Sequence, residues 1–365
     1  MCKEIDEPSA AAPLCGGRAM TQRSTGDADL EWCYDAVTEV SRTFAITIAE
    51  LDEPMARDIC VGYLVCRVAD TVEDDARIPA TEKARLLREY DRVLDPDSDT
   101  TTAEFDAAVT EWVPADPDAD WRVVTQAPRV LATFQALDDE TRERIRPPVR
   151  ELVDGMAEFV ERYAEEGGLR IRTIDELEEY CWYAAGTVGD LVTNLVAQDA
   201  NQSVVERLEA NARDFGLLLQ LVNVAKDVGT DYAEENNVYL PEVWLEEAGV
   251  DAGDIDDPDA VDGLATVVER LTTHAERYLD GAQAWLEAMP EHRGNTLSAW
   301  AIPFLLAVGT LRELKQRPAD PIEQGNVKVS RAEVQAVMSR FGQGATADDL
   351  GRLRERIRQR PLHEW

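Results

Sequence analysis

The sequence predicts an all-α protein, and three observations support this fold class. From Leu30 onward, apolar residues recur three and four positions apart over long stretches, the period of one helix face. Alternating runs of β-branched residues, typical of strands, are few. No internal repeat recurs at a fixed period, so we expect one domain rather than a repeat array. We assign the helical domain to 30–340, a disordered extension to 1–29, and a polar tail to 341–365.

The expected helices cover most of that domain. Segment 31–51 ends at the break Asp52-Glu53-Pro54, and the next helix, 55–74, closes at an acidic cluster. Segment 95–120 is acidic and proline-bearing and is predicted to lie on the surface, whereas 231–241 is predicted to be irregular. Ser330 and Glu333 have the spacing of a capping box. The remaining helices are predicted at 81–94, 122–137, 139–163, 174–197, 204–228, 258–288, 296–315 and 330–341.

The charge limits the partners and the setting of the protein. Asp and Glu total 73 against 37 Lys and Arg, a net charge of −36 spread along the whole chain. Such a surface repels phosphate backbones, so we expect no nucleic-acid partner. Salt screens repulsion among surface carboxylates, which favours a folded protein from a high-salt cytoplasm, such as that of a halophilic archaeon.

The sequence shows no sign of export, membrane insertion or a cysteine-based site. Segment 1–25 has no apolar run of the signal-peptide kind, so a cytoplasmic location is expected. The longest apolar run, 300–311, is too short to cross a bilayer and is expected to be a buried helix. The six cysteines form no CxxC pair and no zinc-type cluster with the three histidines, so we expect reduced thiols.

One predicted helix carries a polar stripe on an otherwise apolar surface. Tyr63, Arg67, Asp70 and Asp74 fall within an arc of roughly 60° on an α-helix, and most of the residues around them are Val, Leu and Ala. A surface helix would instead carry a single apolar stripe. The pattern therefore favours a buried helix that lines a polar site.

A second stripe has the same character. Gln220, Asn223, Asp227 and Asp231 span roughly 80° of a helix that is again rich in Leu, Val and Ala. Each stripe thus holds two carboxylates four residues apart. Mg²⁺ binds one or two carboxylates together with waters and substrate phosphate oxygens. Two facing pairs could hold Mg²⁺ ions around a diphosphate, above an apolar cavity for hydrocarbon.

A solvated acidic helix face is the alternative interpretation of each stripe, because Asp pairs arise easily by chance in a protein this acidic. The apolar surroundings and the existence of a second pair favour the metal site.

The two stripes lie in segments that resemble the aspartate-rich motifs of the squalene and phytoene synthase family. These segments are YLVCRVADTVEDD at 63–75 and LQLVNVAKDVGTDYAEENNVYLPEVW at 219–244. The segments SRTF at 41–44, MAEF at 156–159 and YCWYAAGTVG at 180–189 are also family-like. The resemblance runs from about residue 31 to 338. It implies a single-domain isoprenoid-synthase-type helical bundle around a central cavity, and the activity of a squalene synthase-like prenyltransferase.

The resemblance also implies roles for individual residues. Tyr63, Tyr180 and Arg67 are the expected catalytic residues, and Glu73 lies beside the first pair but off the stripe. The expected metal ligands are Asp70, Asp74, Asp227 and Asp231. The expected diphosphate-binding residues are Arg42, Arg67, Gln220, Asn223 and Lys226. Gly186 and Gly189 are expected to permit close helix contact rather than to act chemically.

The sequence departs from the family pattern at two positions. Lys226 stands where many members have Arg, which keeps the charge but loses the bidentate fork. Asn236 stands where many members have a basic residue just after the second motif. We therefore expect one diphosphate to be bound more weakly unless another group supplies that positive charge.

The C-terminal part resembles the squalene branch of the family, in LSAWAIPFLLAVGTL at 297–311 and GNVKVSR at 325–331. This implies head-to-head condensation of two farnesyl diphosphates to presqualene diphosphate, reduction to squalene with NADPH, and transient membrane contact for product release. Lys328 and Arg331 would bind the NADPH phosphate, although Ser330 falls where a basic residue is usual. They could instead be ordinary surface cations.

Two other functions are considered. A phytoene or dehydrosqualene synthase would share the first step and need no reductant. A non-catalytic prenyl-lipid-binding protein is disfavoured because it has no use for four buried carboxylates.

Overall fold

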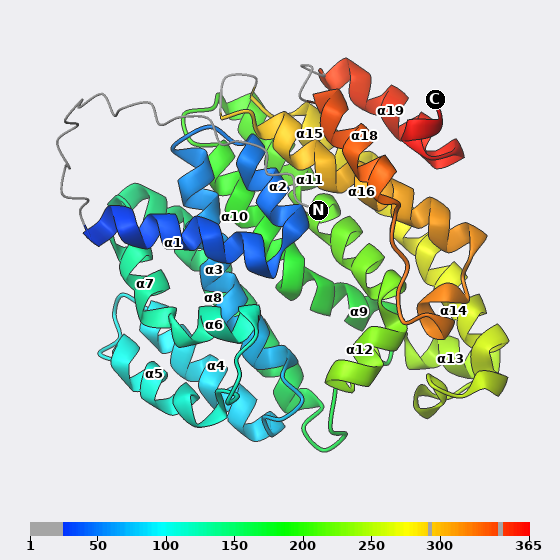
Figure 1. The fold of residues 1–365 in the computed structure, drawn as a ribbon, viewed down its shortest axis with the longest axis horizontal. Coiled ribbons are helices and arrows are strands. Elements are labelled where there is room, and N and C mark those ends of the chain that lie inside the picture. The colour runs from blue at the N-terminus through cyan, green and yellow to red at the C-terminus, as the bar shows by residue number, and fades with distance from the viewer. Residues whose placement is uncertain (1–24, 291–293, 342–345) are drawn as a thin grey trace, which may run out of the picture.

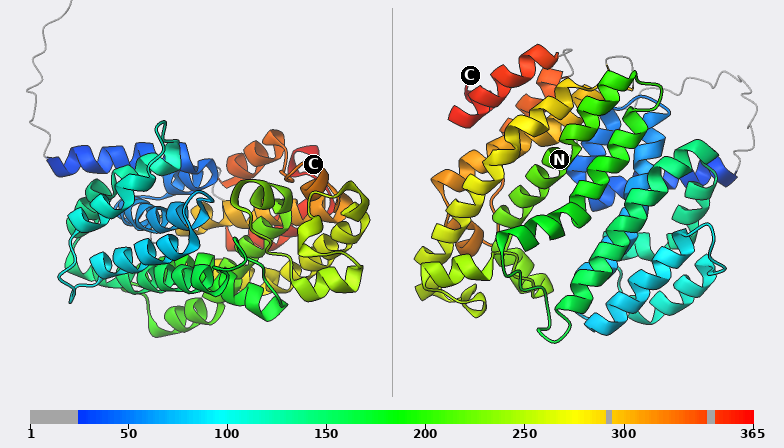
Figure 2. Two further views of the ribbon diagram at one scale, coloured as in Figure 1. Left: turned by 90° about the horizontal axis from the view of Figure 1, so that it is seen from below. Right: turned by 180° about the vertical axis from the view of Figure 1, so that it is seen from behind.

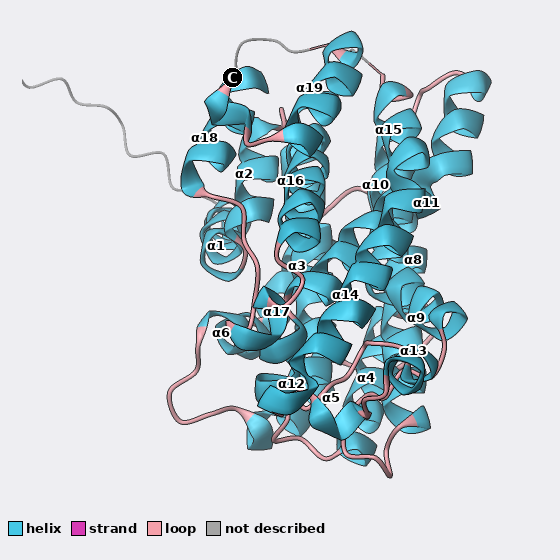
Figure 3. Ribbon diagram, turned by 90° about the vertical axis from the view of Figure 1, so that its right-hand side faces the viewer, coloured by secondary structure: helices cyan, strands magenta, loops and turns pink. Residues whose placement is uncertain are grey.

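The described residues are helical throughout. The computed structural model describes residues 25–290, 294–341 and 346–365, and in these ranges the chain forms helices and no β-strand (Figure 1, Figure 3). A single isolated bridge pairs Arg170 with Val238. The predicted all-α fold class is confirmed.

The helices follow one another with short connections. The first part of the chain forms α1 (Thr25–Val40), α2 (Arg42–Glu50), α3 (Met55–Asp74), α4 (Ala80–Leu94), α5 (Thr102–Val109), η1 (Thr110–Trp112), α6 (Ala119–Thr125), α7 (Ala127–Gln135) and α8 (Asp139–Arg162). The middle forms α9 (Ile174–Cys181), η2 (Trp182–Gly186), α10 (Thr187–Val196), α11 (Gln202–Lys226), α12 (Val228–Glu235), α13 (Glu242–Ala248), η3 (Ala252–Asp254) and η4 (Pro258–Ala260). The last part forms α14 (Val261–Ala275), η5 (Glu276–Tyr278), α15 (Leu279–Glu287), α16 (Thr296–Gln316), α17 (Asp320–Glu323), α18 (Arg331–Phe341), α19 (Ala347–Gln359) and η6 (Leu362–Glu364).

The helices form one body with the earlier and later parts of the chain on opposite sides. Seen from below, the blue and cyan helices lie on one side and the yellow to red helices on the other, with green helices between them (Figure 2). In the first part, α3 packs against α4, α6, α7 and α8. In the later part, α11 packs against α14, α15 and α16. Helix α10 contacts both α3 and α11, and so joins the two halves.

Helix α16 is the most apolar long helix. By length and composition it could cross a membrane, but 83% of its most apolar 18-residue window is buried inside the protein. Trp300, Phe304 and Leu305 are almost completely buried. The prediction of a buried core helix is confirmed.

Several predicted boundaries were wrong. Segment 31–51 is two helices, because Ser41 leaves the helical conformation and its hydroxyl accepts a hydrogen bond from the Phe44 amide as the N-cap of α2. Segment 122–137 is broken at Gln126 into α6 and α7. The segment 95–120 contains α5, and 231–241 begins inside α12. The Ser330 hydroxyl caps the Glu333 amide, but the Glu333 side chain bonds Arg312 instead of completing the capping box.

The ends of the chain also differ from expectation. Residues 1–24 of the predicted extension lie outside the described residues, and helix α1 already begins at Thr25. Residues 346–365, in the segment predicted to be a polar tail, form α19 and η6, and α19 packs against α15 and α16. The buried guanidinium of Arg312 on α16 holds this end in place, because it donates hydrogen bonds to Glu333 and to the Ile357 carbonyl.

Glycines let α11 approach the chain after α9. A Cβ atom on Gly216 would lie 2.7 Å from the Gly186 Cα and 2.8 Å from the Ala185 carbonyl oxygen. A Cβ on Gly189 would lie 3.1 Å from the Ala212 carbonyl oxygen. Gly186 closes η2, a π-helical turn of the kind that is frequent at functional sites. Gly186 and Gly189 therefore serve close packing, as predicted.

The cysteines in the described ranges are free and buried: Cys33, Cys60, Cys66 and Cys181. Burial raises the pKa of the Cys33 thiol to about 11, so it is an unreactive thiol at neutral pH. Cys2 and Cys15 lie outside the described residues.

Candidate active site

The first polar stripe lies on α3 as predicted. Between Cys60 and Asp74 on this helix, the four stripe residues are the partly accessible ones and the rest are buried. The Arg67 guanidinium sits 2.6 Å from the Asp70 carboxylate and donates a 2.7 Å hydrogen bond to the Tyr63 hydroxyl. Its Nε lies 3.7 Å from Asp120 on α6. Arg67 is thus held in one orientation by neighbours on two helices.

The second stripe continues across a helix junction. Gln220 and Asn223 lie on α11, where the Asn223 amide donates a 3.5 Å hydrogen bond to the Gln220 side chain. Asp227 is the junction between α11 and α12, and it forms an ion pair with Lys226. Asp231 follows one turn later on α12. Deeper residues of α11, such as Leu221 and Val224, are buried.

The two acidic pairs approach each other at their C-terminal ends. Burial, Asp227 and Asp74 raise the pKa of Asp231 to about 8. Burial and Asp70 raise the pKa of Asp74 to about 7. Because charges of α3 act on a carboxyl of α12, the structure brings the first and second motifs to one site.

Two further carboxyls belong to this site and were not assigned from the sequence. Burial, Asp74 and Asp231 raise the pKa of Glu235 to about 9. Glu73 is 1% exposed, and its Oε2 has no hydrogen-bond partner among the described residues. Burial and Asp74 raise the pKa of Glu73 well above its ordinary value. Lys83 bonds the Glu73 backbone carbonyl, not the carboxylate.

This arrangement fits divalent cations shared with a phosphate ligand. Several carboxyls here raise one another's pKa, and the Glu73 Oε2 is buried without a hydrogen-bond partner among the described residues. A bound cation would offset the repulsion among these carboxylates. Among the described residues, no three Asp, Glu, His or Cys side chains already stand together as a preformed metal site. Mg²⁺ suits this arrangement because it keeps waters and phosphate oxygens among its ligands. The residues that could hold it are those expected from the sequence, Asp70, Asp74, Asp227 and Asp231.

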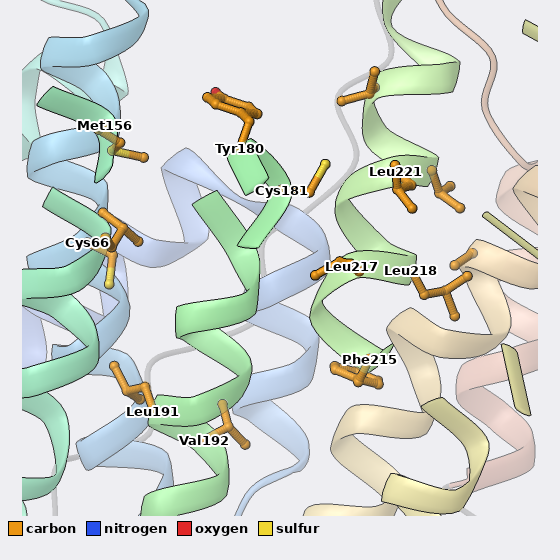
Figure 4. Close-up of a cluster of buried hydrophobic side chains, with 14 of the residues drawn as sticks. Cys66, Met156, Tyr180, Cys181, Leu191, Val192, Phe215, Leu217, Leu218 and Leu221 are labelled. Atoms are coloured by element: carbon orange, nitrogen blue, oxygen red, sulfur yellow. The ribbon is translucent and has the colours of Figure 1, made fainter. Parts of the chain in front are cut away.

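Tyr180 lies at the inner edge of the acidic site. It is 3% exposed, and burial and the nearby Glu73 and Asp74 carboxylates raise its pKa well above the ordinary value. At the end of α9, Tyr180 and Cys181 lie between Met156 and Cys66 on one side and Leu217 and Leu221 on the other (Figure 4). The hydroxyl of Tyr180 lies 3.0 Å from that of Tyr239.

An aromatic wall extends inward from Tyr63. The Tyr63 ring stacks on Phe44 at 4.1 Å, and Phe44 meets Trp300 edge-on at 5.8 Å. Trp300 in turn contacts Phe215, which stacks on Trp285 at 4.2 Å. These rings form a continuous aromatic cluster that begins at Tyr63 of the first stripe. The central cavity expected between the stripes stays a prediction.

The remaining predicted cations are exposed. Arg42 is exposed at the start of α2, next to the Ser41 cap. Lys328 and Arg331 are exposed on and just after the segment that links α17 to α18. That segment is tied to the second motif, because the Val327 amide donates to the Lys226 carbonyl and the Thr230 hydroxyl donates to the Gly325 carbonyl.

The missing basic residue at Asn236 has a structural counterpart. The Arg170 guanidinium donates a 2.9 Å hydrogen bond to the Asn236 side chain and another to its backbone carbonyl. Its acceptors among the described residues are neutral oxygens, so its positive charge is not cancelled by a bonded carboxylate. No local sequence pattern predicts this pairing, because the two residues are 66 positions apart.

The fold and the chain have known relatives. Residues 37–333 match the squalene/phytoene synthase family. Squalene synthase LSS of Botryococcus braunii is 29% identical over 317 residues, covering 86% of this chain and 63% of the relative. Squalene synthase of Eremothecium gossypii is 29% identical over 290 residues, covering 78% of this chain and 62% of the relative. The chain therefore spans about three fifths of the length of these relatives.

Solved structures share the fold. TcSQS in complex with the ligand BPH1237 superposes with a TM-score of 0.73 at 23% identity, covering 91% of this chain and 98% of that one. A dehydrosqualene synthase in complex with a ligand gives a TM-score of 0.62 at 21% identity, covering 87% and 96%.

The described residues share the all-helical fold of these solved structures, and two of their helices carry acidic pairs. More specifically, this chain belongs to the squalene/phytoene synthase family.

Proposed function

We propose that this protein condenses two farnesyl diphosphates head to head to presqualene diphosphate and reduces that intermediate to squalene with NADPH. The observation that carries the proposal is the meeting of the α3 and α12 carboxylates beside the buried hydroxyl of Tyr180. The relatives named squalene synthase support the same assignment. The composition suits work in a high-salt cytoplasm.

The chain's own residues are placed for the first half of this reaction. Asp70, Asp74, Asp227 and Asp231 would hold Mg²⁺, which supplies positive charge to the diphosphate as it leaves. Arg67, fixed by Asp70 and Tyr63, and Lys226 offer donors to phosphate oxygens. Loss of diphosphate leaves an allylic cation at C1, which the alkene of the second substrate attacks. Tyr63 and the aromatic wall behind it face that cation with ring electrons and exclude water.

The second half needs a reductant near the same site. When bound, NADPH would supply the hydride that reduces the cation formed from presqualene diphosphate. Lys328 and Arg331 are candidates for its phosphate, because their segment is hydrogen-bonded to the Lys226 carbonyl at the second motif. Exposed cations at the edge of a site are favourable for an anionic cofactor in a protein of net charge −36.

Product analysis tests this proposal. Labelled farnesyl diphosphate is incubated with the protein and Mg²⁺ in molar KCl, with and without NADPH. We expect squalene only with NADPH, and presqualene diphosphate without it. Lys328→Gln should slow squalene formation but leave the rate of presqualene diphosphate formation unchanged. The control is Lys315→Gln, whose lysine pairs with Glu276, and it should leave both rates unchanged.

A dehydrosqualene synthase is the second candidate, supported by the structural likeness to a protein of that name. A C30 hydrocarbon formed at the same rate without nicotinamide would favour it and remove the NADPH assignment.

A further inference from the structure

The helix that carries the second stripe is interrupted between its two aspartates. Helix α11 ends at Lys226, Asp227 has a φ of −111° and a ψ of 13°, and α12 then begins. Helices break at proline or where another group inserts into the ladder of backbone hydrogen bonds. No proline occurs between Lys226 and Asp231, and in the described chain the Asp227 side chain makes no capping hydrogen bond. An inserted group is therefore the cause to look for.

The inserted group is the backbone that follows α17, which packs against α12 (Figure 3). In a continuous helix the Thr230 amide would donate to the Lys226 carbonyl. It donates instead to the Gly325 carbonyl at 3.1 Å, and the Lys226 carbonyl accepts from the Val327 amide at 2.9 Å. One helical hydrogen bond is thus exchanged for two bonds to the segment 325–327, which lies at least 95 positions further along the chain.

Two further contacts accompany this exchange. The Thr230 hydroxyl donates to the same Gly325 carbonyl at 3.0 Å. A Cβ atom on Gly229 would lie 2.9 Å from the Pro321 carbonyl oxygen and 3.0 Å from the Gly325 Cα, so a larger residue would push the segment away. Gly325 itself has a φ of +81°, which glycine adopts without strain. The residues on both sides of the contact therefore suit the exchange.

The segment 325–327 is anchored to the core independently of α12. Val327 is buried, and the chain after it enters α18, where the Ser330 hydroxyl caps the Glu333 amide. The Glu333 carboxylate forms a buried ion pair with Arg312 of α16 at 2.8 Å. Helix α12, by contrast, has eight residues, of which Val228 is buried. It has little packing of its own, so the anchored segment is what sets its direction.

The direction of α12 decides where Asp231 lies relative to Asp227. Asp227 stays attached to α11, because its amide donates to the Asn223 carbonyl at 3.1 Å, whereas Asp231 lies one turn into α12. A rotation at the joint would therefore move one carboxylate and leave the other behind. Mg²⁺ requires near-ideal octahedral geometry with short bonds to its ligands, so even a small rotation would take Asp231 out of reach.

We propose that Gly229 and Thr230 are positioning residues for the metal site. They let the segment 325–327 set the bend at the α11–α12 joint, and this bend holds Asp231 in place as a ligand of the Mg²⁺ that Asp227 also binds. This inference rests on the proposed function, since it assumes that these carboxylates bind Mg²⁺. The exchanged hydrogen bonds fix the joint before the metal arrives, so that binding does not have to order it.

Gly229→Ala tests whether the bend matters. The new methyl group collides with the segment 325–327, and alanine favours a helix interior more than glycine does. Both effects favour the ordinary bond between Thr230 and Lys226 in a straight helix. We expect the Kd for Mg²⁺ alone, measured by isothermal titration calorimetry in molar KCl, to rise about tenfold or more, as when a group that orients a metal ligand is lost. Helix content by circular dichroism should be retained.

Two substitutions of Thr230 separate positioning from stability. Thr230→Val removes the hydroxyl donor at nearly the same volume, and Thr230→Ser keeps it. We expect Thr230→Val to raise the Kd for Mg²⁺ about fivefold and Thr230→Ser to stay within about twofold of the wild type, since one hydrogen bond is at stake. The matched control is Thr272→Val, because the Thr272 hydroxyl also bonds a helix carbonyl, that of Val268. Its Kd should equal that of the wild type. A merely structural bond at Thr230 predicts lower stability and an unchanged Kd.

The outcomes separate this inference from the proposed function. Each titration is repeated with inorganic pyrophosphate present. A wild type that binds Mg²⁺ under neither condition would overturn the metal site, and with it both the proposed function and this inference. A wild type that binds Mg²⁺, with an unchanged Kd in Gly229→Ala or Thr230→Val, would overturn the inference alone. If Gly229→Ala does not fold, Thr230→Val is compared with Thr230→Ser, and equal Kd values in these two would refute the inference.

Discussion

The carboxylate of Asp74, on α3, lies close enough to Asp231, on α12, for their negative charges to interact. The two residues are 157 positions apart in the chain, yet burial, Asp227 and Asp74 together raise the pKa of Asp231 to about 8. This repulsion destabilises the folded protein, and binding of a cation or a proton at the site reduces it.

This repulsion predicts how stability depends on pH and Mg²⁺. A carboxyl whose pKa is raised on folding binds more protons in the folded than in the unfolded state. The free energy of unfolding therefore falls as pH rises from its ordinary pKa to its raised one. For Asp74 and Asp231 this window runs from about pH 4 to about pH 8. We expect the melting temperature of the metal-free protein to fall across it, and added Mg²⁺ to raise it more at about pH 8 than at about pH 6.

Thermal melts with and without Mg²⁺ at both pH values check this. Asp231→Asn, which removes one of the carboxyls with a raised pKa at this site, should weaken the pH dependence. An Mg²⁺ effect of the same size at both pH values would contradict the placement of these carboxyls at a cation site.

Salt should stabilise the protein strongly. A net charge of −36 on 365 residues repels itself in dilute buffer, and ions screen that repulsion within about 10 Å at 0.1 M and about 3 Å at 1 M. We expect full helical structure in molar KCl and its loss in low-salt buffer. Circular dichroism across a KCl series measures it, and helix content independent of salt would remove the inference of a high-salt origin.

The close contact between α11 and the turn after α9 should not tolerate a methyl group. Gly216→Ala places a Cβ atom 2.7 Å from the Gly186 Cα, so backbone must move, and we expect a loss of about 1–3 kcal/mol in the free energy of unfolding. Gly253→Ala is the control, because a Cβ there meets nothing within 4 Å. The free energy of unfolding of both variants is measured with urea. Equal values would show that the two segments can move apart at this contact without loss of stability.

Helical periodicity in the sequence predicted which polar residues share one face of a helix. Tyr63, Arg67, Asp70 and Asp74 share a face because their spacing matches the helix, and the same face is the accessible one in the structure. The break at Ser41 escaped prediction because apolar residues keep their period across it, while a single side-chain cap ends one helix and starts the next.

Residues outside helices were harder to predict. Asn237 and Tyr239 lie just beyond α12, where no period relates them to other elements. Their partners, Leu169 and Tyr180, are 68 and 59 positions away in the chain. Glu73 was noticed beside the first pair but assigned no role, and Glu235 was not singled out, because their burial depends on how separate helices pack together. Such contacts follow from tertiary structure rather than from local pattern.

The most direct test of the central claim compares one carboxylate from each acidic pair. The rate of diphosphate release from farnesyl diphosphate at saturating Mg²⁺ is measured for the wild type, Asp70→Asn, Asp227→Asn and the exposed control Asp256→Asn. If both pairs serve one site, Asp70→Asn and Asp227→Asn should each lose at least about a hundredfold in rate while remaining folded, and the control should match the wild type. Wild-type rates in either Asp70→Asn or Asp227→Asn would contradict the account.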